Sequence, residues 1–172
     1  MIRVAGIILV MGATLWLGAY FAMKEKYRLQ ELEELERGLI YLQGQISYLS
    51  APLAQAMAGV SWKMNGQLGV VFQKVSEKLT EQQETSAESV WQKIWQEEAV
   101  HTFLAAEDVD AILSFGKSLG YLDKVQQESS IRLLLRYIEG ALNQGRKRLE
   151  KNGRLYYGMG GLTGLLIVVT LL

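Results

Sequence analysis

The sequence predicts an all-α protein in which two transmembrane helices flank an antiparallel cytoplasmic bundle of about six helices. Three observations lead to this prediction. Each end of the 172-residue chain carries a long run without charge, apolar residues in the middle recur at steps of three and four, and no stretch alternates with the period of two typical of a strand. We therefore expect an N-terminal anchor over residues 1–23, a helical domain over 24–154 and a C-terminal anchor over 155–172.

The two ends have the length and composition of membrane spans. Residues 4–23 hold no charge, and a helix of that length crosses a bilayer core of about 30 Å. A cleaved signal peptide is the alternative, but residues 18–23 offer no small-x-small cleavage site. Residues 155–172 span only if nearly upright, and a buried core helix is the alternative there.

Small residues recur at helical spacing in both runs, at Gly18 and Ala22 in the first and at Gly160 and Gly164 in the second. Such faces let helices approach closely. Pairing of the spans with each other or with further copies of the chain is one interpretation, and the general abundance of glycine in membrane helices is the other.

Basic residues predict the orientation. Ten lysines and arginines lie within about 20 residues of the spans on the side of the middle domain, against Arg3 alone on the far side, which places the middle domain in the cytoplasm. Eight of them are also candidates for contact with anionic lipid at the membrane surface: Lys24, Lys26, Arg28, Arg146, Lys147, Arg148, Lys151 and Arg154. The orientation rule alone would also account for them.

The sequence predicts three helices in the first half of the middle domain. Leucines and isoleucines from Leu29 to Leu49 form an apolar stripe, and the glutamates between them read as a solvated face. Pro52 restarts the chain in a short helix that ends near Gly59. A turn at Asn65 and Gly66 leads into a third helix over residues 68–79.

The second half supplies three more helices. The sequence from Thr85 to Glu88 resembles a capping box that opens the next helix. We expect a following helix over residues 107–119 to close at Gly120, and Asp123 with Gln126 to cap a last helix that leads into the C-terminal anchor.

Residues that carry catalytic chemistry are scarce. The chain has no cysteine, a single histidine, His101, and no phosphate-binding loop, so we expect no catalytic residue, metal or cofactor, and no nucleic-acid partner. Trp91 and Trp95, four residues apart, suggest an aromatic ligand box, but they continue an apolar stripe and are better interpreted as core.

Charge is segregated along the chain. Positions 24–28 sum to +2, positions 31–128 to −8 and positions 132–154 to +5. Glu107, Asp108 and Asp110 cluster where a helix starts and are better read as caps than as catalysts. The acidic middle could dock a basic surface of another protein, and an ordinary solvated exterior is the alternative.

Several stretches together resemble the stage III sporulation protein AB family over almost the whole chain. They are Ile46-x-Tyr48-x-x-x-Pro52-Leu53-x-x-Ala56, Thr102-x-Leu104 with Glu107-Asp108, Phe115-Gly116-x-x-Leu119-Gly120-x-x-Asp123-x-x-x-Gln127, and the glycine-rich C-terminal anchor. The third is the most specific. Family members often carry an Arg-Pro step after the first span, where this chain has residues 24–28 without proline.

The resemblance implies a function. The family's soluble part is similar to the cytoplasmic domain of type II secretion F proteins, the membrane platform on which a secretion ATPase acts. It implies a non-catalytic platform in the mother-cell membrane around the forespore, with the cognate sporulation ATPase (protein AA) and other stage III sporulation complex proteins as partners.

The resemblance also suggests a partner-binding set, which takes in the acidic cluster and the most specific motif: Glu107, Asp108, Asp110, Phe115, Gly116, Gly120, Asp123 and Gln127. A membrane-anchored lipid-acting enzyme is the alternative function, motivated by the basic residues and the tryptophan pair. A small transporter subunit is a further alternative, although two spans without internal charge offer no evident path.

Overall fold

The computed structural model describes residues 2–49, 51–81, 86–120 and 124–171, with side chains at residue 20 and over 23–49, 51–81, 86–120 and 125–151. The described residues form six α-helices and one 3-10 turn and contain no strand, so the all-α prediction is confirmed. The helices are α1 (Ile2–Ser47), α2 (Leu53–Ser61), α3 (Gly66–Glu81), α4 (Ala87–Glu98), α5 (Ala106–Gly116) and α6 (Lys124–Leu171), and the 3-10 turn η1 (Ala99–His101) lies between α4 and α5.

The chain divides into two compact units. One comprises Arg28–Leu142, and the other comprises Met1–Tyr27 with Asn143–Leu172. The second unit consists of the first part of α1 and the last part of α6, and the side chains of the two predicted anchors lie outside the described residues apart from Tyr20 and Met23. Among the side chains that are described, no helix combines the length and hydropathy required to cross a bilayer.

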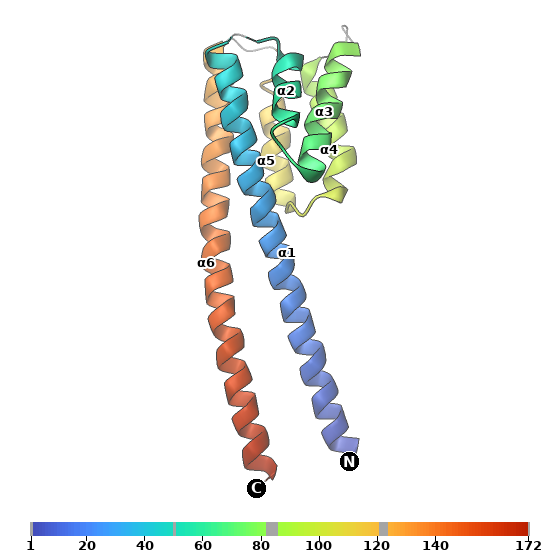
Figure 1. Ribbon diagram of the computed structural model, residues 1–172, viewed down its shortest axis with the longest axis vertical. Helices are drawn as coiled ribbons and strands as arrows, with labels where there is room; N and C mark the ends of the chain where they lie inside the picture. Colours follow the sequence, from blue (N-terminus) through green and yellow to red (C-terminus); the bar gives the residue numbers. More distant parts are fainter. Residues whose placement is uncertain (1, 50, 82–85, 121–123, 172) are drawn as a thin grey trace. The chain divides into compact units, whose positions relative to one another are not determined.

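The unit Arg28–Leu142 is a helical bundle. Four short helices, α2 to α5, lie beside the parts of α1 and α6 that belong to the unit (Figure 1). The predicted apolar stripes supply its core, because each stripe puts its side chains on one face of a helix. Buried members are Leu29, Leu32, Leu35, Leu39, Leu42 and Ile46 of α1, Leu68, Val71, Phe72 and Val75 of α3, and Ile131, Leu134, Ile138 and Leu142 of α6.

Three predicted helix ends are corrected. Leu49 is 66% exposed, since α1 ends at Ser47 and the stripe ends with it. The cap of α4 is Ser86, whose side chain accepts the backbone N–H of Ser89, one residue later than the predicted box. α5 ends at Gly116, before Gly120, because the backbone tightens into a turn in which the Leu119 N–H bonds to the Gly116 carbonyl.

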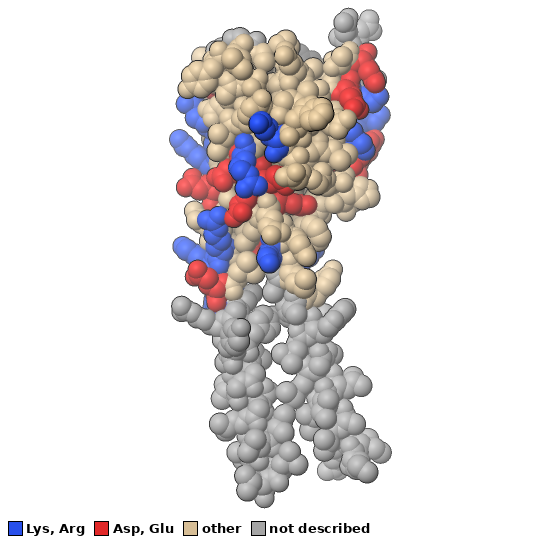
Figure 2. Space-filling view, in the orientation of Figure 1, with Lys and Arg blue, Asp and Glu red and all other residues tan. Residues whose placement is uncertain are grey.

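Charged side chains are unevenly spread over this unit. On the face drawn in Figure 2, acidic residues lie together with basic residues in a band across the middle of the unit. The region above that band, over the C-terminal part of α1 and over α2, is almost wholly uncharged on this face. The unit thus presents two chemically different surfaces.

Candidate protein-interaction surface

An aromatic cluster fixes α4 against α3 and α5. Trp91 is fully buried, and its ring lies edge-on to Phe72 at a centroid distance of 5.6 Å and to Phe115 at 5.4 Å. Its indole Nε1 donates a hydrogen bond of 2.9 Å to the Ile112 carbonyl of α5. Trp95 is also fully buried and contacts the Trp91 ring. The tryptophan pair is therefore core, which removes the motive for an aromatic ligand box.

Gly116 allows the close approach of α5 to this cluster. A Cβ at that position would lie 2.1 Å from Cδ1 of Trp91, far inside van der Waals contact. Gly116 is buried and Phe115 is only 5% exposed. Their assignment to a partner-binding surface is therefore corrected, because both residues pack inside the bundle.

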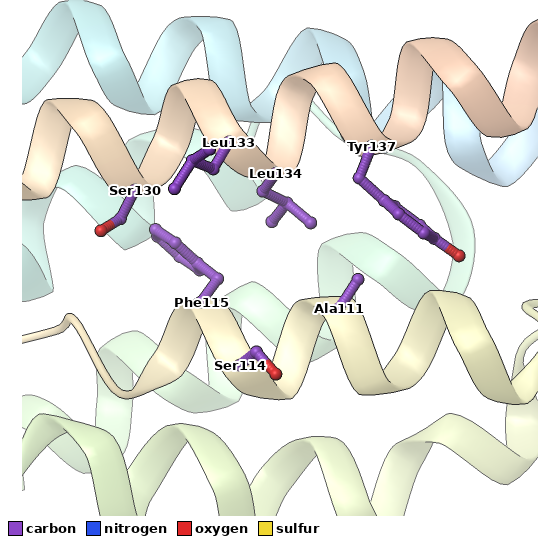
Figure 3. A pocket seen from close by; sticks show the side chains of 7 residues that line it. All are labelled: Ala111, Ser114, Phe115, Ser130, Leu133, Leu134 and Tyr137. Carbon is purple, nitrogen blue, oxygen red and sulfur yellow. The ribbon is translucent and has the colours of Figure 1, made fainter.

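A small cavity separates α5 from α6. It measures about 210 Å³ and is lined by Ala111, Ser114 and Phe115 of α5 and by Ser130, Leu133, Leu134 and Tyr137 of α6 (Figure 3). Its walls are mostly apolar, and the polar groups are two serine hydroxyls and one phenol. These groups supply neither a charged nucleophile nor a pair of carboxylates, so the cavity has the character of a packing gap between two helices.

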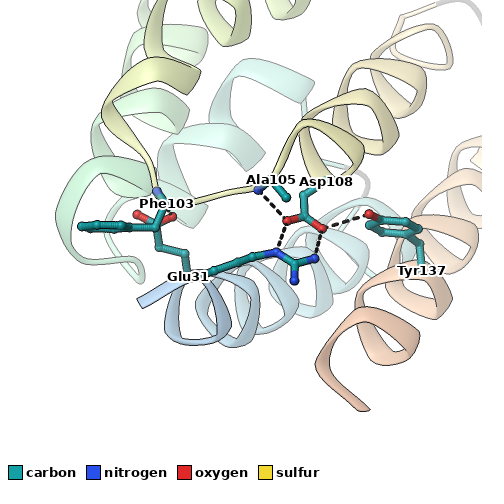
Figure 4. A network of polar contacts seen from close by, with 6 residues as sticks. Glu31, Phe103, Ala105, Asp108 and Tyr137 are labelled. Atoms are coloured by element: carbon teal, nitrogen blue, oxygen red, sulfur yellow. Dashed lines mark hydrogen bonds and ion pairs between the residues drawn. The ribbon is translucent and has the colours of Figure 1, made fainter. Parts of the chain in front are cut away.

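A buried ion pair joins α1, α5 and α6 (Figure 4). Arg28 of α1 binds Asp108 of α5 with both arms of its guanidinium, Nε to Oδ2 at 2.6 Å and Nη2 to Oδ1 at 2.8 Å. The hydroxyl of Tyr137 donates to Oδ1 at 2.9 Å, and the backbone N–H of Ala105 donates to Oδ2 at 2.8 Å. Asp108 is fully buried, and its carboxylate accepts four hydrogen bonds. We call Arg28, Asp108 and Tyr137 the polar hub.

The polar hub holds Asp108 as a carboxylate. Burial alone would raise the pKa of this carboxyl, but hydrogen bonds from Arg28, Ala105 and Tyr137 outweigh it and hold the pKa below the ordinary value for aspartate. Burial, together with the bond to Asp108, raises the pKa of Tyr137 to about 12. Asp108 is therefore a structural anion whose acceptor positions are filled by protein groups, and not a free base.

Two glutamates of α1 fix neighbouring loops. Oε2 of Glu31 accepts the backbone N–H of Phe103 at 2.7 Å, and Glu34 accepts the backbone N–H of Asn65. Burial raises the pKa of Glu31, and the bond from Phe103 offsets part of that effect. The prediction of a merely solvated glutamate face is corrected at these two positions, because their carboxylates satisfy backbone donors of the loops before α3 and α5.

The acidic cluster at the start of α5 divides into one buried and two exposed members. Asp108 accepts the N–H of the residue that precedes α5, as a cap does, but it is closed off from solvent and from any partner. Glu107 and Asp110 are exposed on the same helix. The predicted docking function of Asp108 is therefore corrected, while Glu107 and Asp110 remain candidates.

The other predicted partner residues fall in different environments. Gly120 is exposed and has a φ of 88°, so its backbone conformation accounts for the glycine. Gln127 is half-buried on α6, and Asp123 lies outside the described residues.

Most of the predicted membrane-surface residues are exposed where the structure describes them. Lys24, Lys26, Arg146, Lys147, Arg148 and Lys151 are solvent-accessible. The prediction that Arg28 contacts the membrane surface is corrected, since its side chain is only 13% exposed and binds Asp108. The side chains of Arg154, Gly18, Ala22, Gly160 and Gly164 lie outside the described residues.

Titratable side chains elsewhere do not form a metal site within the described part of the chain, where no three histidine or carboxylate residues cluster. His101 is exposed at the end of η1.

The profile of the family described as Stage III sporulation protein AB (spore_III_AB) matches residues 3–172. The chain belongs to this family. A relative with the same name from Bacillus subtilis (strain 168) is 24% identical over 176 residues, with 100% of each chain covered. A solved structure of Stage III sporulation protein AB (SpoIIIAB) superposes with a TM-score of 0.67 at 21% identity, covering 72% of this chain and 97% of that chain. The resemblance inferred from the sequence is thus confirmed, and with it a role in sporulation.

The sequence did not predict the polar hub, because its two charged members lie far apart in the chain. Arg28 follows the predicted first span, where a basic residue is expected for orientation, and its partner lies 80 positions further on. One signal was available at Tyr137, a hydroxyl-bearing residue beside the buried Leu134 and Ile138 of the α6 stripe.

Proposed function

We propose that the protein is a non-catalytic platform component of a membrane-embedded sporulation complex and that its helical unit docks the cognate ATPase. Residues 4–23 and 155–172 would anchor it in the mother-cell membrane, with the unit in the cytoplasm and exposed basic residues such as Lys24 and Lys147 near anionic headgroups. Family membership supports the sporulation context of this proposal.

The observation that carries the docking proposal is the way α5 is held. Asp108 is tied to Arg28 of α1 and Tyr137 of α6, so the first turn of α5 has a fixed orientation. Glu107 on that turn and Asp110 immediately after it are exposed. A rigid helix that presents two carboxylates favours a basic partner surface, because charge complementarity raises both the association rate and the specificity.

The non-catalytic assignment is supported by the use of the buried polar groups. The four hydrogen bonds to Asp108 occupy the carboxylate that would otherwise be the best general base. Trp91, half of the aromatic pair that motivated the enzyme alternative, donates its Nε1–H to the Ile112 carbonyl within the core.

Charge reversal tests the docking proposal. In sporulating cells that carry the full chain, we expect Glu107→Lys with Asp110→Lys to reduce the ATPase recovered with detergent-solubilised protein by about tenfold or more. Glu97→Lys with Glu139→Lys is the matched control, since both of these glutamates are exposed and the change in net charge is the same. Unchanged ATPase recovery and normal spore yield in the Glu107 and Asp110 variant would refute docking at this surface.

A further inference from the structure

The chain contains a long segment without acidic residues. Residues 37–76 include no aspartate or glutamate, although the whole chain has 18 acidic residues. Within this segment the charged residues are Arg37, Lys63 and Lys74. Because the segment spans the C-terminal part of α1 and all of α2, it supplies a continuous stretch of surface rather than an isolated loop.

Close packing makes α1 and α2 one face. The ring of Tyr41 lies over Gly59, where an added Cβ would be 3.0 Å from its Cε1. The Lys63 ammonium is 6.0 Å from the centroid of the same ring, a cation–π geometry. Val60 of α2 packs against Gly38 of α1, where an added Cβ would be 3.2 Å from Cγ1. The two helices therefore present their outer residues side by side.

Large apolar side chains stand exposed on these two helices and at their ends. Tyr48 and Trp62 are each 88% exposed, Leu49 is 66% exposed and Ile40 is 56% exposed. Exposed tryptophan and tyrosine with few charges is the composition of the centre of a protein interface, where aromatic residues and arginine are enriched and acidic residues are depleted. Single exposed apolar residues would need no explanation, but several within one uncharged face do.

The charges at the edge of this face indicate the partner. Arg37 and Lys63 are exposed, and neither has a carboxylate within 4.0 Å among the described side chains. Glu34, which precedes the acid-free segment on α1, is engaged with the Asn65 N–H. An acidic partner would therefore meet two cations that have no carboxylate partner among the described side chains. A lipid surface fits less well, since segments that bind anionic membranes carry about four to eight basic residues.

We propose that this face, defined by Arg37, Ile40, Tyr48, Trp62 and Lys63, binds an acidic segment of a partner protein, with Trp62 and Tyr48 as apolar anchors. It is distinct from the Glu107 and Asp110 surface, which carries the opposite charge. The two surfaces select different partners, so the protein bridges a basic and an acidic component of its complex.

Site-specific crosslinking in sporulating cells tests the proposal with the full chain. The photoreactive residue p-benzoylphenylalanine replaces Gln55, which is exposed on α2 and leaves both anchors in place. We expect an adduct with a protein whose crosslinked peptide is net acidic. Arg37→Glu with Lys63→Glu should lower the adduct yield about tenfold or more, and Trp62→Ala should do the same.

Controls separate binding from folding. Lys93→Glu with Lys117→Glu makes the same charge change at exposed positions outside this face and should leave the adduct unchanged. Trp62 is 88% exposed, so its replacement should not alter the thermal unfolding of the purified protein. Reversing the acidic residues of the crosslinked peptide should restore the adduct with the Arg37→Glu, Lys63→Glu variant.

Several outcomes would overturn the proposal. These are an adduct with lipid, an adduct with a second copy of the chain, a crosslinked peptide without acidic excess, no adduct, or an adduct insensitive to the charge reversals. Recovery of the ATPase in the Glu107 and Asp110 experiment is measured independently, so either proposal can fail while the other stands.

Discussion

The aromatic cluster and the polar hub hold the same helix, α5, by different physical means. Trp91 packs against Phe115 and Gly116 and uses one hydrogen bond, whereas Asp108 is held by four hydrogen bonds and one buried charge pair. The apolar contact tolerates changes of pH and salt, while the hub depends on the protonation of Asp108. The comparison teaches that the cluster supplies stability by burial and the hub fixes the orientation of the helix turn that presents Glu107 and Asp110.

Breaking the hub should have the largest effect. Arg28→Met leaves the Asp108 carboxylate buried without its cation, which we expect to lower the free energy of unfolding by about 3–5 kcal/mol. Chemical denaturation of the purified protein measures this loss. The double variant Arg28→Met, Asp108→Asn removes both charges and should recover part of it, and a double variant less stable than the single one would contradict the assigned pairing.

The same ion pair predicts a dependence on acid. The pKa of Asp108 in the folded protein lies below its unfolded value near 3.8, so its contribution is complete above that value and is lost as the pH falls through the folded pKa. Denaturation midpoints measured from pH 6 downward should fall more steeply in the native chain than in Asp108→Asn. If the denaturation midpoints of the two proteins fell equally with pH, Asp108 would contribute no pH-dependent stability.

Filling the glycine contact tests the aromatic cluster. Gly116→Ala places a methyl group 2.1 Å from a ring carbon of Trp91, and overpacking of this kind should cost about 1–3 kcal/mol. Gly140→Ala on α6 is the matched control, because an added Cβ there meets nothing within 4 Å. That control should be stabilising by up to about 1 kcal/mol through helix propensity. Equal effects at both positions would contradict the close approach of α5.

Tyr137→Phe removes one hydrogen-bond donor from the hub and should cost about 1.5–3 kcal/mol, since the acceptor that loses this bond, the Asp108 carboxylate, is charged. The sign at high pH follows from the pKa of about 12, above the ordinary value of 10.0. Stability from Tyr137 is complete below pH 10 and is lost between about pH 10 and 12. Between pH 10 and 12 the midpoint temperature of thermal unfolding should fall more steeply with pH in the native chain than in Tyr137→Phe, because this variant has no phenol to titrate.

The smallest expected difference lies within the aromatic cluster. Trp91 Nε1 bonds to the Ile112 carbonyl, whereas Trp95 Nε1 is buried and finds no acceptor among the described residues. Trp91→Phe should therefore cost about 1 kcal/mol more than Trp95→Phe, which is the net value of one hydrogen bond. Denaturation of the two variants under identical conditions decides the point, and an equal loss would place the stabilisation in ring packing alone.

The sequence by itself determined the helical class and most of the core. The stripe residues Leu29, Leu32, Leu35, Leu39, Leu42 and Ile46 of α1 and Ile131, Leu134, Ile138 and Leu142 of α6 are buried as their spacing predicts, because periodicity is a local property of the chain. The turn at Gly66 was also predictable, since its φ of 60° favours glycine. Family membership was readable from the motifs around Pro52 and Phe115.

Tertiary structure alone decided which charged residues are available to a partner. Asp108 and Glu107 are neighbours in the sequence, yet one is fully buried and the other exposed. Arg28 resembles Lys26 in the sequence, but only Arg28 reaches a carboxylate 80 positions away. The reason is physical: helical period assigns a face to each residue, whereas a buried charge is tolerated only where distant helices bring its counter-charge and hydrogen-bond donors to it.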